Sequence, residues 1–402
     1  MIYLDHNAIT PMRPEAKAAV AAALEVFGNP SSVHGAGRAA RDLLDGARER
    51  AARAIGAAPG DLVFTSGATE SAALAIRGVL GAAASRGDGR RRLVVTAVEH
   101  PCVLSLARSL ERQGTPLTVV PVDRRGLVDP GTFRAALGQD VALACAMRAN
   151  NETGVILPVR ELGAAAREAG ALLFCDAVQA VGKIEVDVRT LGADLVALTG
   201  QKLGGPRGAG ALWVRPGLPL APISGGEQEK GRRAGTENLP GIAGLAAALE
   251  AAVAGRAAEA ERVGALRDRL EAGLLAAVPR ARVNGAGAPR LPGTLSITFE
   301  GCDAEALLMA MDLEGLCASA GAACHSGSTK PSGVLLAIGL AEEEARSTLR
   351  LSLGWTTTAA EIDEALHAIP PLVERVRAAI HFTPNSPLTT DAIASGVPIA
   401  GS

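Results

Sequence analysis

The stretch that decides the predicted fold is Ala193-Asp-Leu-Val-Ala-Leu-Thr-Gly-Gln-Lys202-Leu-Gly-Gly-Pro-Arg-Gly-Ala-Gly210. Its apolar run, Leu195 to Leu198, is typical of a short buried strand, and the loop after Lys202 is too rich in Gly and Pro to be helical. One amine therefore stands at the end of a buried strand. Burial disfavours the charged form of an amine, which lowers its pKa and makes it available as a nucleophile or base. A single lysine in a turn is nevertheless more often a surface residue, so the other strand ends must decide.

Length and composition restrict the class of protein. The 402 residues suffice for two or three domains, and 48% hydrophobic with 20% charged residues is typical of a soluble globular protein. The 40 basic and 42 acidic residues nearly balance, so we expect no basic surface for binding nucleic acid or a membrane. The first residues lack a signal-peptide pattern, and we expect no apolar run of membrane-spanning length. We therefore expect a cytoplasmic protein, in which the six cysteines form no disulfide framework.

Strand and helix patterns alternate through the first half of the chain. The strand patterns lie at 62–65, 93–97, 117–122, 141–147, 172–175, 195–198 and 210–214. Alternation with helical patterns predicts an α/β fold with a mostly parallel seven-stranded sheet covered on both faces.

A second region begins beyond this sheet. Residues 245–278 favour one long helix or two, and the strands and helices that follow read as α+β. The predicted divisions are a lead-in on the small-domain side at 1–15, a large cofactor-binding domain at 16–255, a small domain at 256–380 and a tail at 381–402.

Ligands of open parallel sheets bind beyond the carboxyl ends of the strands, so the residues at these ends form a list of candidate site residues. The ends carry Ser66-Gly67-Ala68-Thr69, His100, Asn150-Asn151, Asp176 to Gln179, and Thr199-Gly200-Gln201-Lys202. Taken one at a time, Thr69 and Asp176 are explained as helix caps and His100 as a packed histidine. Together, a phosphate-binding helix start, a flat ring, a buried carboxylate and a lysine are the set that holds pyridoxal phosphate.

Several separate motifs carry a family resemblance. They are Tyr3-Leu-Asp-His-Asn-Ala8, Phe27-Gly-Asn-Pro-Ser-Ser-Val-His34, Thr65-Ser-Gly-Ala-Thr-Glu-Ser71, Asn150-Asn-Glu-Thr-Gly154, Asp176-Ala-Val-Gln-Ala-Val-Gly-Lys183, Gly225-Gly-Glu-Gln-Glu-Lys-Gly-Arg-Arg-Ala-Gly-Thr-Glu-Asn238 and Arg350-Leu-Ser-Leu-Gly354. In unbroken order over residues 3–378, the chain resembles the NifS/IscS-type cysteine desulfurases, which are fold-type I pyridoxal-phosphate enzymes.

The resemblance implies a role for each matching residue. Lys202 would form the Schiff base and move the α-proton, and Asp176 would pair with the pyridine nitrogen. Gln179 would donate to the ring's phenolic oxygen, and His100 would stack on the ring and transfer protons. The phosphate would be held by Ala68, Thr69, Thr199, Gly200 and Gln201, with Thr236 reaching the phosphate of the neighbouring subunit of a homodimer. Asn151, which would also contact the cofactor, and Arg350 would hold the substrate carboxylate.

The same resemblance assigns sulfur transfer to Cys324, which lies in a stretch whose composition is typical of an exposed loop. Cys324 would take sulfur from L-cysteine as a persulfide and leave L-alanine. The expected acceptor is an iron–sulfur scaffold protein, with Cys324 a cluster ligand during transfer and no resident metal. Glu99-His-Pro-Cys-Val-Leu-Ser-Leu106, Arg232 to Asn238 and Ala265 to Gly273 look more like the nitrogenase-linked NifS subgroup than the housekeeping one.

Two positions depart from the family pattern. The family usually has histidine where this chain has Gln201, which can donate a hydrogen bond to phosphate but has no charge, so weaker cofactor retention is expected. Ala322-Ala-Cys-His325 replaces the usual Ser-Ala-Cys-Ser or Ser-Ala-Cys-Thr. His325 either lowers the pKa of the Cys324 thiol or is a tolerated surface residue, and we favour the second interpretation. The alternatives are an aminotransferase or selenocysteine lyase on the same scaffold, and a non-catalytic sulfur-carrier scaffold.

Overall fold

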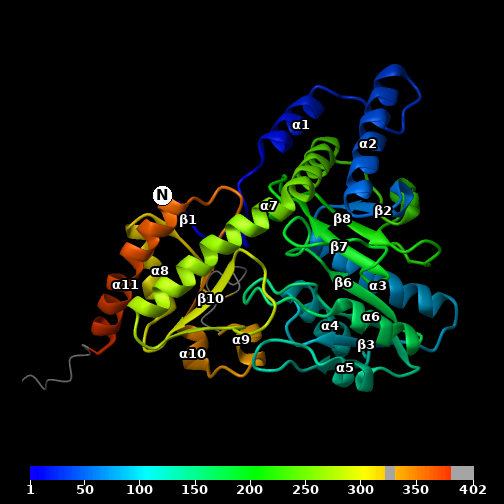
Figure 1. The fold of residues 1–402 in the computed structure, drawn as a ribbon. Coiled ribbons are helices and arrows are strands. Elements are labelled where there is room, and N and C mark those ends of the chain that lie inside the picture. The colour runs from blue at the N-terminus through cyan, green and yellow to red at the C-terminus, as the bar shows by residue number, and fades with distance from the viewer. Residues whose placement is uncertain (322–330, 382–402) are drawn as a thin grey trace, which may run out of the picture.

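A seven-stranded sheet forms the centre of the larger part of the molecule (Figure 1), seen in a computed structural model that describes residues 1–321 and 331–381. Its strand order is β2-β8-β7-β6-β5-β3-β4. The strands are β2 (Leu62–Thr65), β3 (Arg92–Thr96), β4 (Leu117–Val120), β5 (Val141–Cys145), β6 (Leu172–Asp176), β7 (Leu195–Thr199) and β8 (Gly210–Val214). Only β8 pairs antiparallel with its neighbours in this sheet, β2 and β7. The predicted mostly parallel seven-stranded sheet is confirmed.

Both faces of this sheet are covered because its strands are apolar on both sides. In β3, Leu93 and Val95 face α3 (Ala68–Ser85) and α4 (Pro101–Arg112), whereas Val94 faces the opposite core. The main helices of that opposite core are α1 (Pro14–Leu24), α2 (Gly35–Ala54), α5 (Pro130–Ala136), α6 (Val159–Glu168) and the first half of α7 (Leu239–Ala277).

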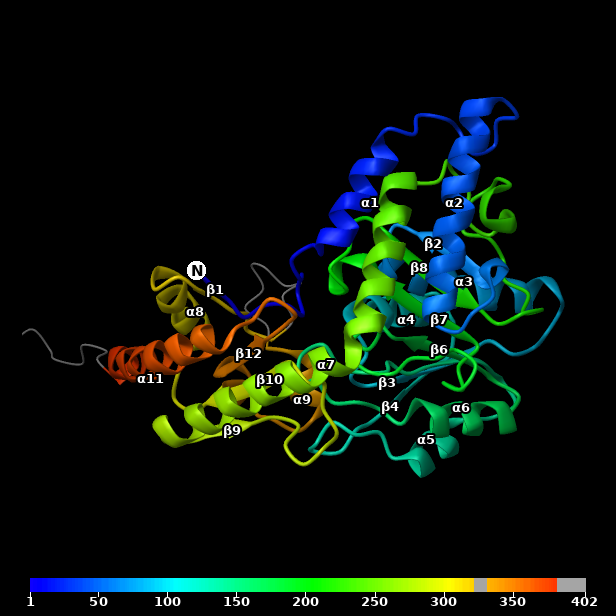
Figure 2. The same cartoon turned by 45° about the horizontal axis from the view of Figure 1, so that its top comes forward.

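A second core lies around a three-stranded antiparallel sheet. Its order is β12 (Thr348–Ser352), β10 (Thr294–Phe299) and β9 (Ala281–Val283). The helices of this core are α8 (Ala304–Leu313) and α11 (Ala359–His381). The short helices α9 (Gly333–Ala337) and α10 (Glu342–Arg346) lie between them in the chain but turn their buried apolar residues toward the core of the large sheet. The start of the chain joins the second core, since β1 (Ile2–Tyr3) pairs in parallel with β11 (Leu316–Cys317). Figure 2 shows these elements on the side of α7 away from the large sheet.

The helix α7 is one continuous helix of 39 residues that serves both cores. Residues up to Ala252 pack in the core of the large sheet, where α1 and α2 lie alongside, and residues from Val263 pack in the second core (Figure 2). By length and composition α7 could cross a membrane, contrary to our expectation of no such run; 56% of its most apolar window is buried inside the protein. Its apolar residues are thus used largely in packing.

Element ends differ from the predictions by a few residues, and the shortest elements were not predicted. The first helix ends at Leu24 rather than near Phe27, and α7 begins at Leu239, with Pro240 in its first turn. The two-residue strands β1 and β11 exist through pairing with each other, which no local pattern encodes.

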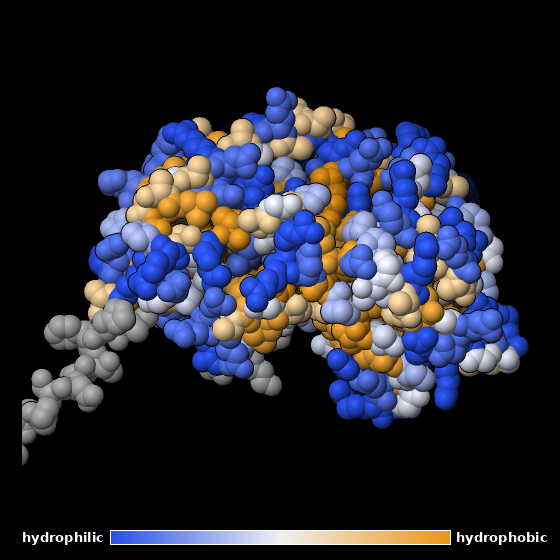
Figure 3. Space-filling model, turned by 60° about the horizontal axis from the view of Figure 1, so that its bottom comes forward, coloured by the Kyte–Doolittle hydropathy of each residue, from blue (hydrophilic) through white to orange (hydrophobic). Residues whose placement is uncertain are grey.

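On the face in Figure 3, hydrophobic residues gather in a band near the middle of the molecule, with hydrophilic residues on both sides.

Candidate active site

A cavity of about 420 Å³ lies at the carboxyl ends of the parallel strands. Its wall comprises Asn7, Ala8, Ile9, Ser66, Gly67, Ala68, Thr69, Glu70, His100, Cys102, Met147, Asn151, Asp176, Val178, Gln179, Thr199, Gln201, Lys202 and Arg350. Ten of the thirteen predicted site residues therefore lie around one cavity, at the edge where open α/β sheets bind ligands.

Lys202 follows strand β7 in the 3₁₀ turn Gly200–Lys202. Its Nζ donates to the backbone oxygen of Asn7 at 2.8 Å and also to that of Ala8. Both carbonyls belong to the N-terminal segment, which passes across the cavity. The lysine predicted at a strand end is thus aimed into the cavity and held in place by main-chain acceptors.

Asp176 is the last residue of β6 and is 5% exposed. Its Oδ1 accepts a hydrogen bond from the backbone N of Val178 at 3.0 Å. Burial raises the pKa of this carboxyl to about 6, and the positive charge of Lys202 opposes that rise. A buried carboxylate needs a cationic partner, so the protonated nitrogen of a pyridine ring suits this position.

The start of α3 forms the end of the cavity suited to an anion. The first amides of an 18-residue helix have no intrahelical acceptor, and the helix dipole adds positive potential there. Gly67 precedes the helix with φ of +154°, and a β-carbon on Gly210 would lie 2.7 Å from the α-carbon of Gly67. This close approach of two glycines opens the helix start to a phosphate beside Ala68, Thr69 and Thr199.

His100 caps the start of α4 with its side chain. Its Nδ1 accepts from the backbone N of Cys102 at 3.1 Å, so the neutral ring carries its proton on Nε2. The cap fixes the plane of the ring at the cavity wall. Such a fixed ring can stack on a flat ligand and hold a proton at Nε2.

Arg350 brings a guanidinium from β12 to the same cavity and is 2% exposed. Its Nη2 donates to Asp5 Oδ1 at 2.7 Å and its Nη1 to the backbone oxygen of Asn151 at 3.1 Å. Two buried polar atoms of the wall, Arg350 Nε and Asn151 Oδ1, have no hydrogen-bond partner within the described residues. Such unsatisfied groups are expected where a polar ligand binds, and a guanidinium suits a carboxylate.

Three predicted site residues are not on the cavity wall. The backbone N of Gly200 donates to the oxygen of Ala209 at 2.9 Å and is thus already used within the fold. Thr236 is exposed and does not line the cavity. Cys324 and the neighbouring His325 lie outside the described residues.

Sequence reasoning missed Asn7 as a site residue. Its side chain is 3% exposed, and its Nδ2 donates to the oxygen of Asn151 at 3.2 Å and to Thr294 Oγ1 at 2.9 Å. Asn7 thereby links the N-terminal segment to both sheets. Its presence in the Tyr3 to Ala8 motif was the available signal, but the motif says nothing about which distant residues it contacts.

Glu99, the residue before His100, was also missed. It is 1% exposed, and its Oε1 accepts from Thr96 Oγ1 at 2.7 Å and from the backbone N of Met147 at 2.6 Å. Its Oε2 has no hydrogen-bond partner in the part of the chain that the structure describes. Burial, with a smaller contribution from the charge of Asp176, raises the pKa of Glu99 to about 8. The carboxyl is therefore mainly protonated at neutral pH.

We expect Glu99→Gln to stabilise the protein at alkaline pH. The pKa of Glu99 in the folded state is above its value of 4.5 in an unfolded chain, so stability is lost as pH rises between 4.5 and about 8. Glutamine keeps the Oε1 acceptor and has no acidic proton to lose, so the free energy of unfolding should rise by about 4 kcal/mol at pH 8. Urea unfolding at pH 5 and pH 8 measures this. The exposed Glu15→Gln is the control, and an equal gain at both pH values would contradict the prediction.

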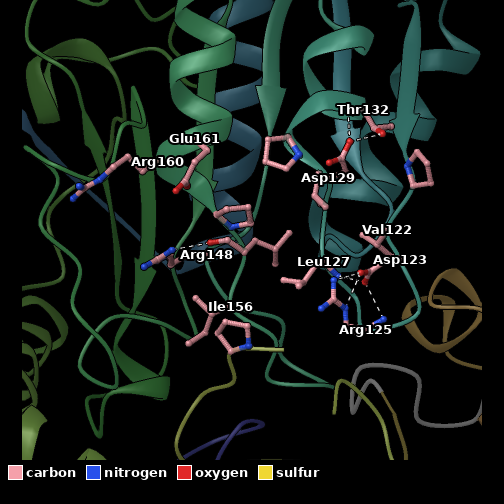
Figure 4. A pocket seen from close by; sticks show the side chains of 16 residues that line it. Val122, Asp123, Arg125, Leu127, Asp129, Thr132, Arg148, Ile156, Arg160 and Glu161 are labelled. Atoms are coloured by element: carbon pink, nitrogen blue, oxygen red, sulfur yellow. Dashed lines mark hydrogen bonds and ion pairs between the residues drawn. The ribbon is translucent and has the colours of Figure 1, made fainter. Parts of the chain in front are cut away.

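A second, larger cavity of about 940 Å³ lies away from these residues, between α5, α6 and the Pro289 loop (Figure 4). Its acids are partly used within the fold, since Asp123 pairs with Arg125 at 2.9 Å and Asp129 accepts from the backbone N of Thr132 at 2.7 Å. None of the predicted site residues lines it. The smaller cavity is therefore the candidate active site, and the described residues contain no group of three or more His, Cys, Asp or Glu suited to a metal.

Comparison with known proteins agrees with this geometry. The model of the aminotransferase class-V family matches residues 2–365. A cysteine desulfurase of Cereibacter sphaeroides is 47% identical over 385 residues, covering 95% of this chain and 98% of the relative. An IscS-like cysteine desulfurase of Mycobacterium tuberculosis is 43% identical over 384 residues, covering 94% and 98%.

Solved structures of similar fold lead to the same family. A NifS-like protein superposes with a TM-score of 0.87 at 32% identity, covering 93% of this chain and 99% of that chain. A NifS-like protein from Rickettsia africae gives a TM-score of 0.84 at 31% identity, covering 93% and 99%. The chain therefore belongs to the aminotransferase class-V family, in its cysteine desulfurase branch.

Proposed function

We propose that this protein is a pyridoxal-phosphate-dependent cysteine desulfurase that converts L-cysteine to L-alanine and transfers the sulfur to Cys324 as a persulfide. The observation that carries the proposal is the single cavity that combines Lys202, Asp176, His100 and Arg350. The identity of 41–47% to proteins named cysteine desulfurase supports the choice of substrate.

The residues present fit the cofactor. Pyridoxal phosphate supplies an electron sink for the carbon atoms of a bound amino acid. Lys202 would hold it covalently, Asp176 would face its pyridine nitrogen and His100 would lie on its ring. The helix start at Ala68 and Thr69 would bind its phosphate.

The substrate would be oriented by the polar groups at the other end of the cavity. Arg350 would bind the substrate carboxylate, with Asn151 beside it. The amine of Lys202 would move the proton at the α-carbon. The carbon–sulfur bond of cysteine breaks and a sulfur–sulfur bond forms on the Cys324 thiol, which leaves alanine and a protein persulfide.

A Cys324→Ala variant tests the proposal. We expect purified wild-type protein to form alanine from cysteine in the presence of a thiol, and the variant to lose this activity by about 10²-fold or more, because the sulfur has no acceptor. Cys317→Ala is the matched control, since Cys317 does not line the cavity. Cysteine turnover that is unaffected by Cys324→Ala would refute the persulfide route and favour an aminotransferase or a selenocysteine lyase.

The absorbance of the purified protein tests the other alternative. A lysine-bound cofactor absorbs visible light, whereas a sulfur-carrier scaffold without cofactor is colourless. Protein that stays colourless after addition of pyridoxal phosphate would favour the scaffold.

Gln201 lines the cavity where the family usually has histidine. We expect Gln201→His to tighten cofactor binding about 2- to 10-fold, because a hydrogen bond to phosphate from a charged donor is stronger than one from an amide. Equilibrium titration of cofactor-free protein with pyridoxal phosphate measures the dissociation constant. Gln113→His on the exposed end of α4 is the control, and an unchanged constant in Gln201→His would count against this role.

We propose a cytoplasmic homodimer in which the exposed Thr236 reaches the phosphate of the other subunit, and the 90% exposed side chains of Phe27 and Val33 support a covered surface there. Light scattering of the purified protein tests whether it is a dimer.

We further propose an iron–sulfur scaffold protein as acceptor of the sulfur and a dedicated role in nitrogenase maturation. Equal growth defects with and without fixed nitrogen after gene deletion would exclude the dedicated role.

The domain division is also a proposal. The two cores meet along α7 between Ala252 and Val263, which supports a boundary near residue 255. For the predicted lead-in at 1–15, Leu4 packs in the second core, which supports the small-domain side for its start, whereas Met12 packs against the core of the large sheet. The predicted tail at 381–402 lies outside the described residues, apart from its first position.

A further inference from the structure

Lys183 is a second lysine beside the cavity, and the proposed function does not use it. Its Nζ donates to Gln179 Oε1 at 2.6 Å and to Asn7 Oδ1 at 3.0 Å. Gln179 in turn donates from Nε2 to the backbone oxygen of Asn7 at 2.9 Å. Gln179 and Asn7 are each 3% exposed, so these bonds are shielded from water.

The partners of the Gln179 amide determine which way it faces. A side-chain amide has an oxygen that accepts and an NH₂ group that donates, and its orientation follows from its neighbours. In the opposite orientation the amide oxygen would face the carbonyl of Asn7, and its NH₂ group would face the amine of Lys183. Both pairs would be unfavourable, so Lys183 and the Asn7 carbonyl together select the observed orientation.

The Asn7 side chain braces this arrangement. Because its Nδ2 donates to the oxygen of Asn151 and to Thr294 Oγ1, its Oδ1 is left to accept from Lys183. Burial, followed by the positive charges of Lys202 and Arg350, lowers the pKa of Lys183 to about 7. An uncharged amine still has two hydrogens, one for each of the two oxygens.

We propose that Lys183 is a positioning residue that fixes the amide of Gln179 with its NH₂ group available to the phenolic oxygen of the cofactor. One hydrogen of this NH₂ group is used by the Asn7 carbonyl, and the second is available to a ligand, since Gln179 lines the cavity. Without Lys183 only the Asn7 carbonyl holds the amide, so the amide turns its oxygen more easily toward the ring oxygen, which repels it. The inference rests on the proposed function because it concerns the same cofactor site.

The variant Lys183→Met tests the proposal, since methionine keeps an unbranched chain but has no donor. A donor to the ring oxygen stabilises negative charge there and so lowers the pH at which the bound cofactor loses its proton. We expect Lys183→Met to raise the midpoint of the visible absorbance titration by about 0.5–1 pH unit and to weaken cofactor binding about 3- to 10-fold. Lys183→Arg, which keeps the donors, should restore most of both.

A double-mutant cycle separates positioning from a direct effect of the lysine charge. If Lys183 acts through Gln179, Gln179→Leu gives a similar titration shift, and adding Lys183→Met to it changes the midpoint no further. A second shift of similar size in the double variant would overturn the proposal, as would an unchanged midpoint in Lys183→Met. If Lys183→Met does not fold, Lys183→Gln replaces it in the same double-mutant cycle, because glutamine removes the ammonium group but keeps a polar side chain.

The outcomes distinguish this inference from the proposed function. Wild-type protein that takes up no pyridoxal phosphate would refute the proposed function itself. Wild-type protein that binds the cofactor and titrates, alongside a Lys183→Met variant with the same midpoint and dissociation constant, would refute only the role of Lys183.

Discussion

A Lys202→Ala variant is expected to form alanine from cysteine at least about 10³-fold more slowly than the wild-type protein. Lys202 brings its amine from the end of β7 into the cavity, where the carbonyl of Asn7 holds it at 2.8 Å. In the proposed mechanism the substitution removes both the covalent attachment of the cofactor and the group that moves the α-proton. Alanine formed per minute at saturating cysteine and added pyridoxal phosphate measures the effect.

Two further variants make this result specific. Lys17→Ala removes an exposed lysine on α1 and should leave the rate unchanged. Lys202→Arg keeps a positive charge but not a primary amine, so it should be as inactive as Lys202→Ala. If Lys202→Ala keeps more than a tenth of the wild-type rate, another amine performs the chemistry.

The second large effect is expected from Arg350→Leu. Its guanidinium is 2% exposed and is the candidate group for the substrate carboxylate. Two charge-assisted hydrogen bonds contribute about 1.5–3 kcal/mol each, so kcat/KM for cysteine should fall about 10²- to 10⁴-fold, mainly through KM. Steady-state kinetics over a wide range of cysteine concentrations separates the two parameters.

Arg350→Leu should also destabilise the fold, because Asp5 loses the partner that lies 2.7 Å away. The Asp5 side chain is 17% exposed, and leaving such a partly buried charge without its hydrogen-bond partner costs about 1–3 kcal/mol. The double variant Asp5→Asn/Arg350→Leu should recover much of this stability without recovering kcat/KM. Recovery of both would mean that Arg350 serves the fold and not the substrate.

The sequence predicts the large sheet and most of the cavity because their signals are local. Apolar runs give the strands, and polar residues directly after them, such as Asp176 and Lys202, must meet at one edge of a parallel sheet. The family resemblance adds Arg350, whose distant strand no periodicity could have placed there. The predictions of fold, family and desulfurase class are confirmed by the comparisons.

The contacts of the N-terminal segment could not be predicted in the same way. Asn7 bonds to residues that are 144 to 345 positions away in the chain, and its own neighbours in sequence give no sign of this. The protonation of Glu99 likewise depends on burial by distant strands. A pattern identifies which residue types are present, whereas these properties follow from the packing of several elements together.

The position of the N-terminal segment also has a consequence for the order of events during synthesis. Residues 5 to 8 leave the ribosome first, yet Asp5 and Asn7 find partners in Arg350 and Ser352, which are made near the end. Contacts of such long sequence separation form late in folding. The nascent chain therefore cannot complete the wall of the candidate active site until almost all of it has been translated.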